Sequence, residues 1–376
     1  MRIAVIGGKL QGVEIVYLAL KAGFKTLVID KDLHVPAGEI CDHFLQFHIL
    51  PEEEWPLEVG EIDLIFPALE DVGTLAILNQ WASQFKIPIV LDFTAYQLSN
   101  SKNQSNALFK KLHLPLPAVW PDCSFPVVVK PDQASGSSGV FVASDEEEIV
   151  SALSQSSGDN VVQEYLEGPS FSVEIIGRPG NYLTLQVTDL VVDRDYDCCG
   201  VGAPTILESR LEEKLHNLAR TIAEEIALQG IMDLEVILHE GELKILEIDA
   251  RFPSQTPIAV FLSTGMNMVE ILTDLFVNGV IQKKCNMTRH ARLDHVRVHP
   301  AGCELLGEHI MAGDGPLKIV SDFFGADEAL TTFMPGKKEW VATLLFYADS
   351  KQEVEVKRER CLRKIARQGN TPEPLV

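Results

Sequence analysis

The first 95 residues alternate between short apolar runs and longer amphipathic stretches. The apolar runs have the length and the branched residues of strands, and helical patterns separate them. Strands are predicted at residues 2–8, 25–30, 62–68 and 87–93, and helices at about 11–22 and 72–85. This alternation predicts a small doubly wound parallel sheet, in which ligands bind at the carboxyl ends of the strands.

The pattern changes after residue 95, and two further domains are predicted. A short helix at about 99–111 and a proline-punctuated connector at 114–122 lead to a small α/β module at 125–168, whose helix opens with a capping box at Ser144–Glu147. From Ser170 the chain is β-rich, with helices at about 208–227 and 258–276, a strand at 340–348 and a basic helix at 355–367. The predicted domains are 1–95, 96–169 and 170–376.

Four carboxylates crowd one hairpin-like stretch of the β-rich region. If residues 240–242 form its loop, Asp233 lies opposite Asp249 and Glu235 lies opposite Glu247, all on one face with Arg251. The apolar residues expected on that acidic face are Ile237, Leu243 and Ile245, and those expected on the other face are Leu234, Val236, Leu238, Leu246 and Ile248. Like charges that face each other destabilise a sheet unless a cation joins them, which predicts a divalent ion. The alternative is a hairpin with a solvated acidic face.

Composition narrows the class of partner. A net charge of −22 over 376 residues argues against nucleic acid or an anionic membrane, because both favour basic patches. The seven cysteines include no CxxC pair and are expected to be reduced thiols in a cytoplasmic protein; they are residues 41, 123, 198, 199, 285, 303 and 361. The chain begins in a strand, and no apolar run reaches about 18 residues, so neither a signal peptide nor a membrane span is expected.

The glycine cluster at residues 7–12 invites a dinucleotide reading. Lys9, however, stands where the middle glycine should let the backbone approach a pyrophosphate, which argues against NAD and an oxidoreductase. The loop is instead expected to hold an anion or an amino acid at the start of the helix. The alternative is a plain strand-to-helix turn.

Two lysines and a glycine-rich loop suit a phosphate group. Lys102 lies just before a helix, and Lys130 ends an apolar strand. A loop rich in N–H and O–H donors follows Lys130, formed by Ser135, Gly136, Ser137, Ser138 and Gly139. An extended segment that suits an adenine edge comes later, formed by Glu164, Tyr165 and Leu166. A surface loop and an ordinary strand end are the alternatives.

The remaining candidates are acids and one arginine. Glu70 follows the third strand, and Asp197 lies in an acidic, aromatic stretch that suits a substrate ammonium group, although a solvated loop is the alternative. Arg251 can stabilise a transferring phosphoryl group or an acyl phosphate, unless it only pairs with Asp249. The chain has no HExxH or GxSxG motif, which argues against a zinc enzyme or a serine hydrolase.

Taken in order, these motifs resemble the ATP-grasp superfamily. The segments at 7–12, 230–235 and 247–257 (EIDARFPSQTP) are similar to its pyrrolysine-biosynthesis ligases. The resemblance covers nearly the whole chain. It implies an α/β ATP-grasp fold with an N-terminal doubly wound parallel sheet, a small α/β lid and a larger α+β C-terminal domain.

The resemblance also implies roles for the candidate residues. Lys102, Lys130 and the segments 135–139 and 163–167 would bind ATP, and Arg251 and Glu235 would be catalytic. Mg²⁺, or Mn²⁺ as an alternative, would be held by Asp233, Glu247 and Asp249. Two positions depart from the family: Asp249 replaces a common asparagine, and Ser170 replaces a ribose-binding glutamate, which leaves Glu167 as the candidate for the ribose.

The implied reaction joins the carboxyl group of 3-methyl-D-ornithine to the side-chain amine of L-lysine through an acyl phosphate. Both substrates carry ammonium groups, for which Glu235 is the first candidate and Glu70 and Asp197 the next. Substrate contacts are further expected from Lys9, Leu10, Gln11, Ser254 and Gln255. Glu235 and Asp197 both remain candidates for the base that deprotonates the attacking amine, and a homodimer is a family-based expectation. Alternatives are a purine-pathway carboxylase, a dipeptide ligase, or a nucleotide or amino-acid sensor without activity.

Overall fold

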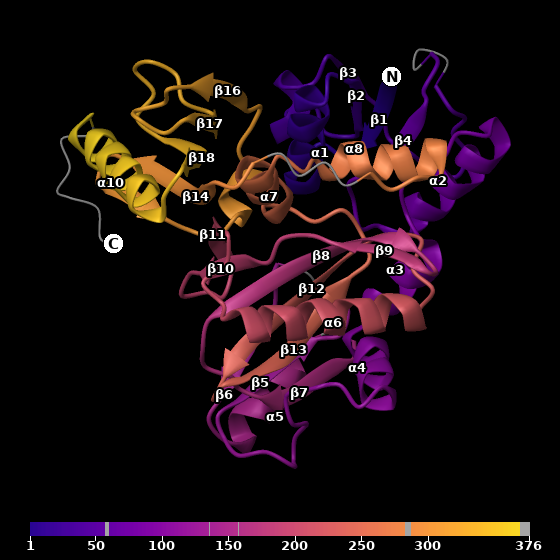
Figure 1. Cartoon of the computed structure of the whole chain (residues 1–376), viewed down its shortest axis with the longest axis vertical. Helices are drawn as coiled ribbons and strands as arrows, with labels where there is room; N and C mark the ends of the chain where they lie inside the picture. Colours follow the sequence, from indigo (N-terminus) through magenta and orange to yellow (C-terminus); the bar gives the residue numbers. More distant parts are fainter. Residues whose placement is uncertain (57–59, 135, 157, 283–286, 369–376) are drawn as a thin grey trace. The chain divides into compact units, whose positions relative to one another are not determined.

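The computed structural model describes residues 1–56, 60–134, 136–156, 158–282 and 287–368, and its chain divides into two compact units (Figure 1). Unit 1 comprises Met1–Leu91, Cys198–Pro204 and Phe252–Val376, and unit 2 comprises Asp92–Asp197 and Thr205–Arg251. The division into three domains made from the sequence stays a prediction, because a division by compactness does not test it.

Unit 1 opens with the predicted parallel sheet. Its strand order is β3-β2-β1-β4, with every neighbouring pair parallel. The elements are β1 (Arg2–Ile6), α1 (Leu10–Lys21), β2 (Lys25–Asp30), a 3-10 turn (Pro36–Glu39), β3 (His43–Gln46), β4 (Leu64–Pro67) and α2 (Val72–Phe85). The strand predicted at 87–93 is wrong: it is reduced to a single bridge between Ile65 and Ile89, and Asp92 already caps the next helix. Strand β3 was not predicted, because its pattern is half-exposed.

The rest of unit 1 is built on strands in the order β11-β14-β18-β17-β16, and β15 pairs with β14. Its elements are β11 (Cys198–Ala203), α7 (Thr256–Thr264), α8 (Met268–Thr273), a π-helical turn (Asp274–Asn278), β14 (His290–His299), β15 (Gly302–Leu305), α9 (His309–Ala312), β16 (Lys318–Ser321), β17 (Glu328–Thr331), β18 (Trp340–Ala348) and α10 (Lys351–Gln368). Helix α10 packs its apolar side on β14 and β18.

The single helix predicted at 258–276 is wrong. Gly265 adopts a left-handed conformation (φ 76°) and ends α7, and Asn267 caps α8. No single helix among the described residues is long and apolar enough to cross a membrane; α7 and the segment 268–278 meet that test only together, and they are bent by 100° at their break. The six described cysteines are free thiols, and Cys285 lies outside the described residues.

Unit 2 contains a small antiparallel sheet with strand order β6-β5-β7, in the stretch where the sequence predicts a small α/β module. The elements of this part are α3 (Phe93–Ser99), α4 (Lys102–Lys111), β5 (Val127–Pro131), β6 (Phe141–Ala143), α5 (Glu146–Gln155) and β7 (Asn160–Glu164). The capping box of α5 lies one residue later than predicted: the Asp145 side chain accepts a hydrogen bond from Glu148 N, and Glu148 accepts one from Ser144 N.

The larger sheet of unit 2 has the order β13-β12-β8-β10, and β9 pairs with β8. Its elements are β8 (Ser170–Arg178), β9 (Asn181–Thr184), β10 (Thr188–Val192), α6 (Ser209–Glu225), β12 (Gly230–His239) and β13 (Glu242–Asp249). One face of this sheet is covered by α6, which buries Leu215, Ala219 and Ile222 against it (Figure 1). Apolar residues fill that face, so the polar residues of β12 and β13 gather on the other.

Candidate active site

The four predicted carboxylates lie in register on neighbouring strands of unit 2. Asp233 pairs with Asp249 and Glu235 pairs with Glu247, as the sequence predicts. On the other side of β12, Asp233 pairs with Glu174 of β8, which is fully buried. Glu174 was missed because it lies in an apolar strand far along the chain from the hairpin. The acidic face therefore spans three strands.

The hairpin reaches this register by a different route from the one predicted. Its turn has two residues, Glu240 and Gly241, both with positive φ (50° and 82°), as a two-residue hairpin turn requires. The pairing then jumps from Val236–Ile245 to Glu235–Glu247, which leaves Leu246 as a β-bulge. The placement of Leu243 and Ile245 on the acidic face is therefore wrong: the bulge turns both into the apolar core. Ile237 stays on the acidic side, where it pairs with Lys244.

Burial and mutual repulsion disfavour charge on two of these acids. The pKa of Asp233 is raised well above its ordinary value by burial and then by Asp249 and Glu235. Burial, with Glu247 and Asp249, raises the pKa of Glu235 to about 8. Burial would also raise the pKa of Glu247, yet Lys102 and Lys130 hold it below its ordinary value. The neutral, protonated form is therefore favoured at Asp233 and Glu235, and the charged form at Glu247.

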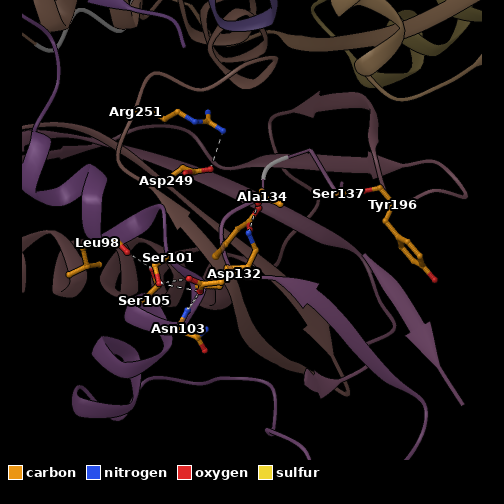
Figure 2. A network of polar contacts seen from close by, with 12 residues as sticks. Leu98, Ser101, Asn103, Ser105, Asp132, Ala134, Ser137, Tyr196, Asp249 and Arg251 are labelled. Atoms are coloured by element: carbon orange, nitrogen blue, oxygen red, sulfur yellow. Dashed lines mark hydrogen bonds and ion pairs between the residues drawn. The ribbon is translucent and has the colours of Figure 1, made fainter. Parts of the chain in front are cut away.

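Three cations meet this face, each from a residue that the sequence singled out. Lys102 is the first residue of α4, and its Nζ lies 3.3 Å from Glu247 Oε2. Lys130, near the end of β5, has its pKa lowered by burial, against the opposing charge of Glu247. Arg251 donates to Asp249 Oδ2 at 3.1 Å (Figure 2). A polyanion at this face would therefore meet a cation at the start of α4, one near the end of β5 and one just after β13.

These carboxylates suit a divalent ion by their chemistry. In the described part of the chain, no group of three or more His, Cys, Asp or Glu side chains is arranged to hold a metal as it stands. Glu247 and Asp249 face Lys102 and Arg251 instead. However, Asp233 Oδ1 is buried and accepts no hydrogen bond within the described ranges, and carboxylate oxygens of this kind are the ligands that Mg²⁺ takes. The residues fit the ion, and their role as its ligands stays a prediction.

The glycine-rich loop after β5 takes up left-handed conformations. Gly136, Ser137 and Gly139 have φ values of 58°, 55° and 74°. Ser137 donates to the main-chain oxygen of Tyr196 at 2.7 Å (Figure 2), whereas Ser138 is exposed. Ser135 lies outside the described residues. The loop thus contacts the stretch that carries Asp197, which is 6% exposed.

The predicted adenine segment leaves β7 with part of its chemistry already used. The Glu164 carboxylate accepts a hydrogen bond from Ala118 N at 2.6 Å, which makes it a structural contact. Gln163 and Leu166 are buried, and Glu167 N donates to the ring of His239 at 3.2 Å. The ring of Tyr165 packs edge-on against that of Tyr196. Beyond this segment, a side chain on Gly168 would meet Leu238 O at 2.0 Å, so the backbones approach closely here.

Unit 1 holds a second group of the predicted residues in a cavity of about 670 Å³. Lys9, Leu10, Gln11 and Glu70 line it at the carboxyl ends of β1 and β4, and Gln11 Nε2 donates to Glu70 Oε1 at 3.0 Å. Asp30 accepts a hydrogen bond from Gly8 N at 2.7 Å, so its carboxylate ties the turn together. These four residues, which the sequence named separately as substrate contacts, thus line one cavity, and their role in binding stays a prediction.

Ser254 and Gln255 lie at the start of α7, in a strained turn. Gln255 has φ 71° and ψ −53°, and Thr256 N donates to Ser254 O at 2.9 Å across it, which defines a γ-turn. Gln255 is 5% exposed, and its Oε1 accepts no hydrogen bond from any residue that the structure describes. Ser254 donates to Glu308, a residue that no motif had marked. Strain and an unused buried acceptor are typical of a ligand contact.

Comparison with known proteins agrees with this geometry. The family described as ATP-grasp domain matches residues 99–255. The chain is 34% identical over 360 residues to the 3-methyl-D-ornithine–L-lysine ligase of Methanosarcina acetivorans, and 33% identical over 364 residues to the ligase of the same name from Methanosarcina mazei. These alignments cover 95% of both chains in the first case, and 96% of this chain and 94% of the relative in the second.

Solved structures confirm the predicted fold class. The biotin carboxylase domain of Hydrogenobacter thermophilus 2-oxoglutarate carboxylase, in complex with MgADP, aligns with a TM-score of 0.73 at 17% identity, over 96% of this chain and 89% of that one. An ADP complex of N5-carboxyaminoimidazole ribonucleotide synthetase aligns with a TM-score of 0.71 at 16% identity, over 98% and 97%. With its fold, its acidic face and its full-length relatives, the chain belongs to the ATP-grasp carboxylate–amine ligases, in the family of the 3-methyl-D-ornithine–L-lysine ligases.

Proposed function

We propose that this ligase uses ATP to join the carboxyl group of 3-methyl-D-ornithine to the ε-amine of L-lysine, the amide-forming step of pyrrolysine biosynthesis. The observation that carries the proposal is the acidic face of β12 and β13 with Lys102, Lys130 and Arg251 directed at it. The full-length relatives bear the name of this reaction. A carboxylate is a poor electrophile, and its conversion to an acyl phosphate lets an amine displace phosphate.

The nucleotide would bind in unit 2. Lys102 and Lys130 would contact phosphate oxygens, the described donors of the loop 136–139 would cover them, and the segment 163–167 would hold the adenine. Mg²⁺ would be held by Asp233, Glu247 and Asp249, with Mn²⁺ as a substitute, and when bound it would neutralise charge on the phosphates. Arg251 would then leave Asp249 and bind the acyl phosphate. Its planar guanidinium suits this role because it can donate to two oxygens at once.

The substrates bring ammonium groups and carboxylates, and the chain offers both kinds of partner. The cavity of unit 1 presents the Lys9 ammonium, the Gln11 amide and the Glu70 carboxylate, which suit the two ends of an amino acid. Gln255 Oε1 would accept from an ammonium group. Burial, with Glu247 and Asp249, raises the pKa of Glu235, which makes it the first candidate for the group that takes a proton from the attacking amine, and Asp197 is the second.

The test is an ADP-release assay across pairs of diamino acids. We expect release only when a 3-methyl-D-ornithine-like acid and L-lysine are both present, and mass spectrometry should find one amide, at the ε-nitrogen of lysine. An amide at the α-nitrogen would refute the substrate assignment. Release with bicarbonate in place of the amino acids would instead favour a carboxylase.

The oligomeric state is a separate proposal. The Hydrogenobacter carboxylase domain is described as a dimer. We expect this chain also to form a homodimer, and light scattering after size exclusion would show twice the mass of 41.6 kDa. A mass of one chain would contradict it.

A further inference from the structure

Asp132 lies at the base of the glycine-rich loop, directly after β5, and its side chain joins it to the start of α4 (Figure 2). The residue is 8% exposed. Its carboxylate accepts hydrogen bonds from Ser101 Oγ at 2.9 and 3.1 Å and from Asn103 N at 2.7 Å. Its main-chain N donates to Asp159 O at 2.9 Å, next to β7. Asp132 thus links three segments of unit 2: the base of the glycine-rich loop, the start of α4 and the residue that precedes β7.

The residue between those two donors is Lys102. Its main-chain N donates to Asp132 O at 3.2 Å, and its Nζ donates to Ala134 O at 2.6 Å. Both ends of the lysine are therefore held by residues 132–134. The first turn of α4 and the start of the glycine-rich loop form one hydrogen-bonded block, and Lys102 is its most constrained member.

The position of the Asp132 carboxylate at the start of α4 strengthens its hydrogen bonds. Asn103 N is one of the donors that a helix leaves unpaired at its start, and an anion there also meets the positive end of the helix dipole. Ser101 caps the same helix by accepting from Gln104 N, and it donates its own proton to Asp132. The Ser101 hydroxyl therefore works in both directions, which fixes its rotamer and that of Asp132.

We propose that Asp132 is a positioning residue, which holds the Lys102 ammonium in place for the nucleotide phosphates and ties it to the loop that covers them. The inference rests on the proposed function, in which Lys102 binds phosphate. A lysine side chain has four flexible bonds, and binding loses affinity when those bonds must be ordered on arrival of the ligand. By holding the chain atoms and the ammonium acceptor of Lys102 together, Asp132 removes much of that cost before the nucleotide binds.

A residue that only capped α4 would behave differently. Its loss would lower the stability of unit 2 and leave the contribution of Lys102 unchanged. Asp145 offers the matched control: it is also an acid at a helix start and accepts from Glu148 N at 2.9 Å, but no candidate nucleotide residue lies in that turn.

The experiment is a double-mutant cycle on MgADP binding by the full-length protein, measured by titration calorimetry. Asp132→Ala should weaken MgADP about tenfold, the size of coupling within one hydrogen-bond network. It should weaken it no further in a Lys102→Met background. The KM for ATP should rise by a similar factor, with kcat and the KM for L-lysine within about twofold of wild type, and Asp145→Ala should leave all of these unchanged.

Asp132→Asn keeps an acceptor for Asn103 N and should recover part of the affinity, which provides a folded variant if the alanine variant is unstable. Equal effects of Asp132→Ala with and without Lys102, or unchanged MgADP affinity in both Asp132 variants, would overturn the positioning role. If Lys102→Met itself leaves MgADP affinity unchanged, the assignment of the nucleotide site fails instead.

Discussion

His295 should make the stability of unit 1 depend on pH in a way that one substitution removes. The imidazole is 4% exposed in β14, and its Nδ1 lies 2.9 Å from Thr343 Oγ1. Its Nε2 is buried and has no hydrogen-bond partner among the described residues. Burial lowers the pKa of His295 to about 4, even though the charge of Asp294 acts in the opposite direction.

The sign follows from which state binds the proton first. As the pH falls through 6.5, the unfolded chain protonates this histidine while the folded chain does not, so the proton favours unfolding. Stability is therefore fully present above pH 6.5 and is lost as the pH falls toward 4, where the folded state also protonates. A difference of about 2.5 between the two pKa values corresponds to about 3 kcal/mol in total.

The perturbation is His295→Gln, which keeps a polar partner for Thr343 and removes the titration. Urea unfolding of the ligand-free protein should be followed at pH 7.5 and pH 4.5. Between these values wild type should lose about 2.5 kcal/mol more than the variant. His34→Gln, at an exposed position, controls for the loss of an imidazole. Equal losses in wild type and His295→Gln would refute the reasoning, because the buried imidazole would then play no part.

Three further substitutions test the site. Glu247→Gln should lower turnover by roughly a hundredfold or more, because it removes a charge that the site positions for catalysis, and unchanged steady-state rates would remove its role. Ser137→Ala loses the hydrogen bond to Tyr196 O, worth about 1 kcal/mol, and should raise the KM for ATP about fivefold with little effect on the KM of the amino acids; an equal rise in all three would contradict a role in covering the nucleotide. Gln255→Gly should relieve the γ-turn and raise the free energy of unfolding by about 1 kcal/mol while activity falls, and a loss of both in the denaturation and ADP-release assays would argue against stored strain.

The sequence predicted those features that depend on local pattern. The sequence placed Asp233 opposite Asp249 with a three-residue loop, and the register is right because the shorter two-residue turn is offset by one bulged residue. Leu243 and Ile245 were assigned to the wrong face because a bulge leaves no pattern in a run of apolar residues. Glu174 and Asp132 were missed for another reason: each is important through a partner far along the chain, Asp233 in one case and Ser101 in the other, and nothing local marks them.

Two boundaries show the same limit. The apolar run at 87–93 looks like a strand, yet the side chain of Asp92 accepts from Thr94 N and Ala95 N and starts a helix inside it. The capping box of α5 moved by one residue, because Asp145 and Glu148 offer the same spacing as Ser144 and Glu147. Propensity alone does not choose between Ser144 and Asp145, because both residue types are favourable helix caps.

The bulge at Leu246 separates two stretches of the hairpin that are held by different contacts. Between the bulge and the turn, Leu243 and Ile245 pack in the apolar core. Beyond the bulge, Glu247 and Asp249 of the same strand form ion pairs with Lys102 and Arg251. Substitutions in the turn at Glu240 and Gly241 should therefore leave the acidic face in place. If the strand paired without this bulge, the register of Val236 with Ile245 would continue, and Glu247 and Asp249 would lie opposite Leu234 and Met232 in the apolar layer.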